Sequence, residues 1–290
     1  MNELMETAMH ALQTYENVEQ AESAMLSMPQ VDCPVVHYFA PGIAIRQVFL
    51  PAGALAVGHK QKFPHMNVML TGKVVMLNDN GSTTTLSAPL TFVAQPGRKI
   101  GYVLEDVLWQ NIYATELADA AAVEAHFIEK SDAWQEQAAV KLAEESLSRA
   151  ADRQDYLDLL SQCGILHETA RKQSENVDDQ TRVPCTSVMV SDSAIEGKGL
   201  FATVAFESGD LICPARLAGL RTQAGRYVNH SLTPNAMMIP LENGDIDLVA
   251  LRDIAGCKGG ELGAEITIDY RKALALSGIQ FKAKEFLCQA

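Results

Sequence analysis

The chain has 290 residues, of which 48% are hydrophobic and 20% are charged, so it can bury the core of two domains or of one large domain. Its formal net charge of -13 disfavours generic nucleic-acid binding, and no apolar run approaches the ~20 residues that a membrane span needs. The first thirty residues contain no Lys or Arg, which argues against a secretory signal. We therefore expect a cytoplasmic protein without nucleic-acid or membrane partners.

The cysteines are scattered along the chain, and none stands in the C-x-x-C spacing of a zinc site. This pattern indicates reduced, mostly buried thiols in a reducing compartment. The six residues are Cys33, Cys163, Cys185, Cys213, Cys257 and Cys288.

Residues 1–29 are expected to form an N-terminal helix, because Leu4, Met9 and Leu12 recur at near-helical spacing. The outer face of this helix is acidic. Its apolar face is expected to pack on its own domain or on a second subunit, and docking of a partner protein is the alternative.

Residues 30–115 have the composition of a β domain. Runs rich in Val, Ile, Leu and Thr are separated by turns such as Pro41-Gly42 and Pro96-Gly97, which predicts a β-barrel or a sandwich. Within 74–86, the pair Asn80-Gly81 separates two strand-like runs and predicts a hairpin.

The same region carries a distinctive spacing of Gly53, His59, Gln61, His65 and Gly72. This run resembles the first metal-binding motif of the cupins, which are small β-barrels that often hold a metal. The resemblance implies a cupin-like β-barrel in which His59, Gln61 and His65 stand at ligand positions.

The ligand set is poor, because two histidines and a glutamine do not match the three or four good ligands that a divalent ion prefers. Where the second cupin motif would supply a further histidine, this chain has Ile100. We expect a barrel without metal, used for structure or assembly. His37 would improve the set if it reaches the same cavity, and binding of a small ligand there is a further alternative.

Residues 116–182 are expected to be a helical connector. Three Ala-rich segments without proline predict helices, and Gly164 is placed to end the last of them. Their apolar sides are interpreted as packing surfaces, and the polar run at the end is interpreted as a linker. The helical segments are 116–130, 134–150 and 152–163, and the linker is 172–182.

Residues 183–272 carry three polar motifs between short apolar runs. These are Gly197-Lys198-Gly199, then Asn229-His230 within the polar run 226–235, and then Asp269-Tyr270 after an apolar run. A polar run in a half-apolar domain needs hydrogen-bond partners or a ligand. Strands are expected over 188–190, 200–204, 211–213, 245–251 and 265–268, and a helical tail over 273–290.

The three motifs, in this order, resemble the SET domain, the fold of many protein lysine methyltransferases. The resemblance implies an α+β, mostly β chain with a C-terminal minimal SET domain that uses S-adenosylmethionine. The domain is minimal because the segment between Cys213 and Asn235 is short. Leu232 stands where many SET proteins have a zinc-binding cysteine, so no zinc is expected.

Methyl transfer to lysine requires a neutral amine, whose ordinary pKa is about 10.4. A narrow apolar channel favours the neutral amine by desolvation, and a tyrosine hydroxyl at its end can orient the nitrogen. The resemblance implies that Tyr270 is this catalytic tyrosine and that Tyr227 lines the channel. A core-capping role is the alternative for Tyr270. Arg226 and Glu265 are interpreted as structural and as a pair.

The resemblance also implies where the cofactor lies. Gly197, Lys198 and Gly199 would let the backbone approach it, and Asn229 and His230 would contact it largely through backbone groups. The alternative role of Asn229 and His230 is to hold together the crossed loops that SET domains form at this point, and both roles are compatible.

The combination of a cupin-like barrel with a minimal SET domain resembles proteins encoded by tailed bacteriophages and prophages, with further likeness in 29–37 and 101–109. The leading hypothesis is a lysine methyltransferase acting on a phage or host protein. The alternative is a catalytically weak or inactive structural protein that decorates a phage capsid or tail and is virion-associated. A homo-oligomer is expected in either case.

Overall fold

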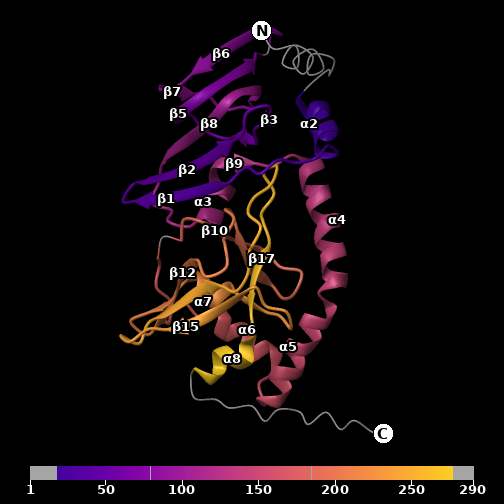
Figure 1. Cartoon of the computed structure of the whole chain (residues 1–290), viewed down its shortest axis with the longest axis vertical. Helices are drawn as coiled ribbons and strands as arrows, with labels where there is room; N and C mark the ends of the chain where they lie inside the picture. Colours follow the sequence, from indigo (N-terminus) through magenta and orange to yellow (C-terminus); the bar gives the residue numbers. More distant parts are fainter. Residues whose placement is uncertain (1–17, 79, 184, 277–290) are drawn as a thin grey trace.

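The computed structural model describes residues 18–78, 80–183 and 185–276, which form two β-rich units joined by helices (Figure 1). The N-terminal unit lies at one end of the elongated molecule and the C-terminal unit at the other. The long helix α4 (Asp132–Ser148) runs along one side between them. The chain is mostly β with some helices, as expected. Residues 1–17 of the expected N-terminal helix and 277–290 of the expected tail lie outside the described residues.

The N-terminal unit is one seven-stranded sheet that folds over on itself. Its longest strands, β5 (His65–Leu77) and β8 (Ile100–Ala114), pair antiparallel and bend together where their register shifts. At the bend Gly72 has φ +86°, and a Cβ there would lie 2.3 Å from the carbonyl oxygen of Asp106, so only glycine fits. The other strands are β1 (Val35–Ala40), β2 (Ile43–Leu50), β3 (Leu55–Val57), β6 (Thr83–Ser87) and β7 (Leu90–Ala94).

The strands do not close into a ring. The sheet order is β1-β2-β8-β5-β6, with β3 on β8 and β7 on β5, so β1 and β6 each have one strand neighbour among the described residues. The β-barrel expected here is therefore not a closed barrel in the described part of the chain. Because β5 and β8 bend, the two halves of the open sheet face each other across a shared apolar cluster. The sheet therefore has an interior although its edge strands do not pair with each other.

Alternate residues of β8 point into this interior. Val103 and Val107 of β8 are fully buried, and Trp109 follows on the same face. The expected hairpin over 74–86 is confirmed, because β5 and β6 pair from Lys73 opposite Ser87 to Leu77 opposite Thr83.

Helix α2 (Val18–Leu26) covers part of the sheet. Ala21 is buried there in a cluster with Val75, Ile100 and Tyr102. One residue later, both oxygens of Glu22 accept hydrogen bonds from the guanidinium of Arg98, at 2.9 and 2.5 Å. This ion pair holds α2 against the segment that leads into β8.

The helices expected over 116–163 are confirmed, because their start signals lie in the local sequence. The carboxylate of Asp119 caps α3 (Ala120–Phe127), and the hydroxyl of Ser131 caps α4. The connector continues through α5 (Ala150–Gln162) and α6 (His167–Ser174). A short strand pair, β4 (Lys60–Gln61) with β9 (Ile128–Glu129), ties the connector to the N-terminal unit. No helix in the described part of the chain is long and apolar enough to cross a membrane.

The C-terminal unit contains two four-stranded sheets around one apolar core. The first has the order β10-β11-β17-β14, in which β14 and β17 are parallel. The second has the order β13-β12-β16-β15. The elements are β10 (Val188–Asp192), β11 (Lys198–Ala202), β12 (Leu211–Leu217), β13 (Leu220–Arg221), α7 (Gln223–Tyr227), β14 (Asn229–His230), β15 (Ala236–Pro240), β16 (Ile246–Ala250), β17 (Glu265–Ile268) and α8 (Tyr270–Ala275).

Two of the six cysteines form a disulfide in the core of this unit. Cys185 and Cys213 are bonded across a separation of 28 residues, with their Cα atoms 6.0 Å apart. The expectation that these two thiols are reduced is therefore wrong. Their spacing in sequence gave no signal, because the pairing arises where β12 packs against the segment before β10. Cys33, Cys163 and Cys257 are free thiols.

The two units also contact each other directly, through segments 31–33 and 257–260. The backbone of Cys33 donates to Cys257, and that of Gly259 donates to Val31. The Gly260 N–H donates to the Cys33 sulfur at 3.0 Å. In Figure 1 the loop that precedes β17 reaches from the C-terminal unit up to the N-terminal unit.

Candidate functional site

The three C-terminal motifs meet in space. The carboxamide nitrogen of Asn229 donates to the carbonyl oxygens of Glu196 and Lys198, each at 3.1 Å, and so holds the turn at Gly197. The same nitrogen lies 2.9 Å from Oε1 of Glu265, at the start of β17. A Cβ at position 199 would lie 2.3 Å from that carboxylate oxygen, which explains the glycine there.

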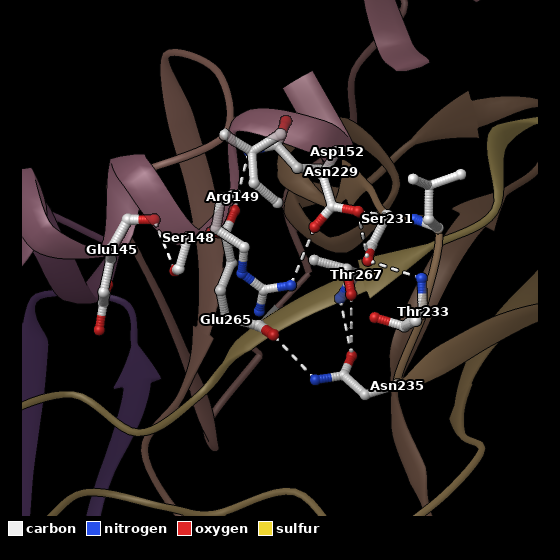
Figure 2. A network of polar contacts seen from close by, with 12 residues as sticks. Glu145, Ser148, Arg149, Asp152, Asn229, Ser231, Thr233, Asn235, Glu265 and Thr267 are labelled. Carbon is white, nitrogen blue, oxygen red and sulfur yellow. Dashed lines mark hydrogen bonds and ion pairs between the residues drawn. The ribbon is translucent and has the colours of Figure 1, made fainter. Parts of the chain in front are cut away.

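Glu265 is the acidic centre of this junction, and Figure 2 shows its surroundings. Its carboxylate is buried and accepts a hydrogen bond from the hydroxyl of Ser193 at 2.7 Å. Burial raises the pKa of Glu265, while the donors Asn229 and Ser193 oppose that rise. Its expected partner Arg226 instead donates to Gln180 at 2.6 Å.

Asn235 closes the other side of the junction, as Figure 2 shows. Its carboxamide donates to the Glu265 carbonyl oxygen at 2.8 Å and accepts from the Thr267 N–H at 2.8 Å. The side chain thus imitates a strand neighbour of β17. Side-chain hydrogen bonds of Asn229 and Asn235 thus hold this junction together.

His230 connects the junction to the candidate catalytic tyrosine. The Tyr270 N–H donates to Nδ1 of His230 at 3.2 Å, so Nδ1 carries no proton, and Nε2 donates to Asp155 at 2.7 Å. Asp155 also accepts from both terminal guanidinium nitrogens of Arg271, at 2.5 and 2.9 Å. The hydrogen bonds from Arg271 lower the pKa of Asp155 to about 2.

Tyr270 lies in an apolar setting with its hydroxyl engaged. That hydroxyl donates to the carbonyl oxygen of Val228 at 2.9 Å. Burial raises the pKa of Tyr270, so the phenol keeps its proton and acts as a donor. The ring stands edge-on to Tyr156 of α5, with 5.9 Å between the ring centroids.

The remaining predicted residues point elsewhere. Tyr227 packs against the core at the end of α7, and the guanidinium of Arg226 lies 4.7 Å from its ring centroid. The ammonium of Lys198 pairs with Asp192 at 2.6 Å on the exposed side of the turn. Only its backbone belongs to the junction.

Helix α5 covers the Asn-His-Ser segment, a contact that sequence reasoning missed. Oδ1 of Asp152 accepts from the Ser231 hydroxyl at 3.1 Å and from the Leu232 N–H at 2.7 Å. Arg149 donates to its other oxygen at 3.0 Å (Figure 2). Asp152 and Asp155 are three residues apart on one helix, and that spacing is the signal that could have indicated a polar contact face.

The N-terminal unit holds a cavity of about 600 Å³. His59 and Gln61 line it, whereas His65 is not among the lining residues and its Nδ1 lies 3.1 Å from the Phe63 carbonyl oxygen. The side-chain oxygen of Gln61 accepts from the Tyr113 hydroxyl at 3.0 Å. Within the described ranges, no three His, Cys, Asp or Glu side chains are grouped so that they could hold a metal ion.

His37 belongs to a different cluster. Its imidazole is fully buried, with Nε2 3.7 Å from the Glu124 carboxylate, and Glu124 also accepts from Arg46 at 2.9 Å. Burial lowers the pKa of His37 to about 4, and the same cause lowers the pKa of His59 to about 4. Both imidazoles are therefore neutral at pH 7.

Polar residues that sequence reasoning did not single out line the cavity. Asn67 accepts from Trp109 Nε1 at 2.8 Å and from Asn111 at 2.7 Å. Arg46 and Lys99 also line the wall. Arg46 and Val48 are two residues apart on β2, so their side chains point to the same face of the sheet. This spacing is the signal that places Arg46 on the inner face.

Comparison with known proteins gives low similarity. No family model and no curated protein matches the chain. A cupin domain from Bordetella pertussis is similar to 31% of this chain over 99% of its own length, with 14% identity and a TM-score of 0.26. A cupin domain of an XRE family transcriptional regulator from Enterobacter cloacae is similar to 29% of this chain over 97% of its own, with 17% identity and a TM-score of 0.24. A protein of unknown function from Vibrio parahaemolyticus has 12% identity over 28% of this chain, with a TM-score of 0.26.

Proposed function

We propose that the C-terminal unit is a minimal SET-type protein-lysine methyltransferase that uses S-adenosylmethionine. The observation that carries the proposal is the convergence of the three motifs. Asn229 joins the Gly-x-Gly turn to Glu265, and His230 joins the same segment to the backbone of Tyr270. Residues that lie far apart in the chain thus form one junction, as a shared site requires.

The residues present fit the cofactor through their backbone. Gly197 has φ +53°, and no heavy atom lies within 4 Å of the position of a Cβ there, so the outer side of its turn is open to a ligand. The side chains of Asn229 and His230 are engaged by the chain itself, which limits them to positioning roles. S-adenosylmethionine, when bound, would supply the methyl group.

The chain would supply orientation and desolvation. The Tyr270 phenol is protonated and fixed by the Val228 carbonyl oxygen, so its oxygen can accept a hydrogen bond from a neutral amine while its proton stays in place. The apolar surroundings that raise the pKa of Tyr270 also favour the neutral form of a lysine placed beside it. The proposed acceptor is a lysine side chain of a phage or host protein.

A mass-spectrometric methylation assay tests the proposal. Purified protein, S-adenosylmethionine and lysine-rich polypeptides from a host lysate are expected to yield +14 Da lysine adducts, by the mass of one methylene. Tyr270→Phe is expected to lower the rate about 100-fold, the range that removal of one catalytic group produces. Tyr102→Phe, in the N-terminal unit, is the matched control. Equal rates for wild type and Tyr270→Phe would exclude the role of Tyr270.

A specific observation favours a second candidate, an assembly protein without turnover. Helix α5 occupies the side chains of His230 and Ser231, and a cofactor would have to bind without displacing it. Such a chain could decorate a phage capsid or tail. Counting copies in purified particles distinguishes the candidates, because a decoration protein is present in fixed, ordered number and an enzyme need not be.

A further inference from the structure

The cavity of the N-terminal unit is composite. Its walls come from the folded sheet, from Met25 of α2, from Trp134 of α4 and from Gly259 and Gly260 of the C-terminal unit. Its volume of about 600 Å³ lies within the 300–1,000 Å³ typical of small-molecule sites. A ligand there would be enclosed by both units of the chain.

The cavity is lined by both apolar and polar residues. Val48 and Leu50 of β2 face Val74 and Met76 of β5 in the same apolar cluster. Asn67 of β5 also lines the cavity, and its side-chain oxygen Oδ1 already accepts from Trp109 and Asn111. This arrangement suits a ligand with an apolar body and one polar group.

Two buried polar atoms of the lining residues have no hydrogen-bond partner. Asn67 is fully buried, and its Nδ2 has no hydrogen-bond partner; Nδ1 of His59 is also buried without one. Lys99 is half-buried in the wall, and within the described residues no hydrogen bond or ion pair is recorded for its ammonium. Burial is the cause that lowers the pKa of Lys99, and no acid opposes it.

Lys99 and Asn67 both line this cavity. The other charged side chains that line the cavity are compensated. Arg46 is paired with Glu124, and Glu22 is paired with Arg98. Among the charged residues that line the cavity, Lys99 is therefore left without a counter-charge in the described part of the chain.

We propose that the cavity binds a monoanionic organic acid with an apolar body, whose carboxylate is held by Lys99 and whose body lies along Val48, Leu50 and Met76. Because the Lys99 ammonium and the Asn67 Nδ2 lack acceptors, the ligand is expected to supply acceptor oxygens. A single uncompensated cation matches one carboxylate better than a phosphate dianion. The site is independent of the proposed methyl transfer.

Calorimetry on the full chain tests this site with octanoate, decanoate and 3-phenylpropanoate as acids. Octylamine and octan-1-ol are the matched probes without negative charge. At least one acid is expected to bind once per chain, and about tenfold more tightly than octan-1-ol, which corresponds to about 1.4 kcal/mol. No binding of any acid at millimolar concentration, or equal binding of octylamine, would overturn the proposal.

Variants of Lys99 separate a binding role from a structural one. Lys99→Met is expected to weaken acid binding about tenfold while raising the melting temperature of the ligand-free protein, because a desolvated, unpaired cation is removed. Lys99→Gln provides a second variant with a polar end. Lys73→Met, which removes an ammonium paired with Glu105 on the outer face, is the control. Unchanged acid affinity in both Lys99 variants, or a lower melting temperature in both, would contradict the assignment.

Discussion

At the scale of single residues, the C-terminal junction depends on one carboxamide. The Nδ2 of Asn229 has four acceptors within 3.1 Å, from Ser193, Glu196, Lys198 and Glu265. The Ser193 hydroxyl supports the same junction, because it accepts from the Glu196 N–H at 3.4 Å and donates to Glu265 at 2.7 Å. The alternative role of Asn229, which is to hold the crossed loops together, is thus supported whatever the chemistry of the site.

Asn229→Ala is expected to destabilise the protein by about 2–4 kcal/mol. The substitution leaves two carbonyl oxygens and the buried Glu265 carboxylate short of a donor, and an unsatisfied buried group costs about 1–3 kcal/mol. Urea unfolding monitored by circular dichroism measures the change. Asn243→Ala, at an exposed turn, is the control and should cost less than about 0.5 kcal/mol. A loss below about 1 kcal/mol for Asn229→Ala would show that the junction has other support.

Two buried histidines predict a loss of stability in mild acid. His37 and His59 have folded pKa values of about 4 against an ordinary value near 6.5, so between these pH values only the unfolded chain takes up their protons. Stability must then fall as pH falls, by up to about 1.4 kcal/mol per pH unit for each histidine. Glu265 has the opposite effect on stability. Because its pKa is raised in the folded protein, the folded chain takes up this one proton more readily than the unfolded chain, so this carboxyl favours folding as pH falls.

The test is the pH dependence of the unfolding free energy between pH 6 and 4.5. His59→Phe should reduce the slope by about one proton. The same slope in wild type and His59→Phe would mean that His59 is not the titrating group.

At the scale of elements, α5 is the part of the connector that controls the candidate site. Asp152 and Asp155 bind four groups of the C-terminal unit, the hydroxyl of Ser231, the N–H of Leu232, the imidazole of His230 and the guanidinium of Arg271. The helix is held by charge-assisted hydrogen bonds, and its acidic face is the contact face.

Asp155→Asn is expected to lower stability by about 1–3 kcal/mol at pH 7, because the anion that pairs with Arg271 and His230 is removed. The carboxyl has a folded pKa of about 2, below the ordinary 3.9, so its contribution is present above pH 4 and is lost as pH falls toward 2. The difference between wild type and variant should therefore shrink in acid. Asp158→Asn, on the same helix, is the control, and a constant difference from pH 7 to pH 2 would contradict this explanation.

The sequence predicted local elements better than it predicted their contacts. The helices of the connector and the hairpin of β5 with β6 follow from caps, turns and periodicity, all of which are local. Strand β15 and helix α7 were not predicted, because both are short and adjoin the polar run 226–235.

Long-range features escaped the sequence for a different reason. The disulfide of Cys185 with Cys213, the open form of the sheet and the contacts of Asp155 depend on which surfaces meet after folding. No spacing within one segment encodes these partners. The candidate site residues were suggested by a family resemblance, and the contact between Asn229 and Glu265 is compatible with it.

At the scale of the whole molecule, the outer face of the N-terminal sheet has the apolar character of an interface. Met66 of β5 pairs with Val93 of β7, and the two are 44% and 62% exposed. Leu70 follows on β5 and is 43% exposed. Neighbouring exposed apolar side chains on one sheet face are typical of association surfaces.

A homo-oligomer is accordingly predicted, with a second copy on this face. Light scattering with size-exclusion chromatography should give a mass of at least twice the 31.5 kDa of one chain. Val93→Asp should shift the protein toward the monomer, because a buried unpaired charge would oppose association. Val140→Asp, at an exposed position on α4, should not. A monomeric wild type at high micromolar concentration would exclude the prediction.

The measurement that bears most directly on the central claim is calorimetric titration of the full chain with S-adenosylmethionine. Binding of one molecule per chain is expected, with affinity weakened at least about tenfold by Gly197→Val, because a β-branched residue is strained at φ +53° and disturbs the turn. Gly81→Val, at a hairpin turn of the N-terminal unit, provides the control for general effects of such a substitution. Absence of heat and of any shift in melting temperature at millimolar cofactor would contradict the methyltransferase assignment.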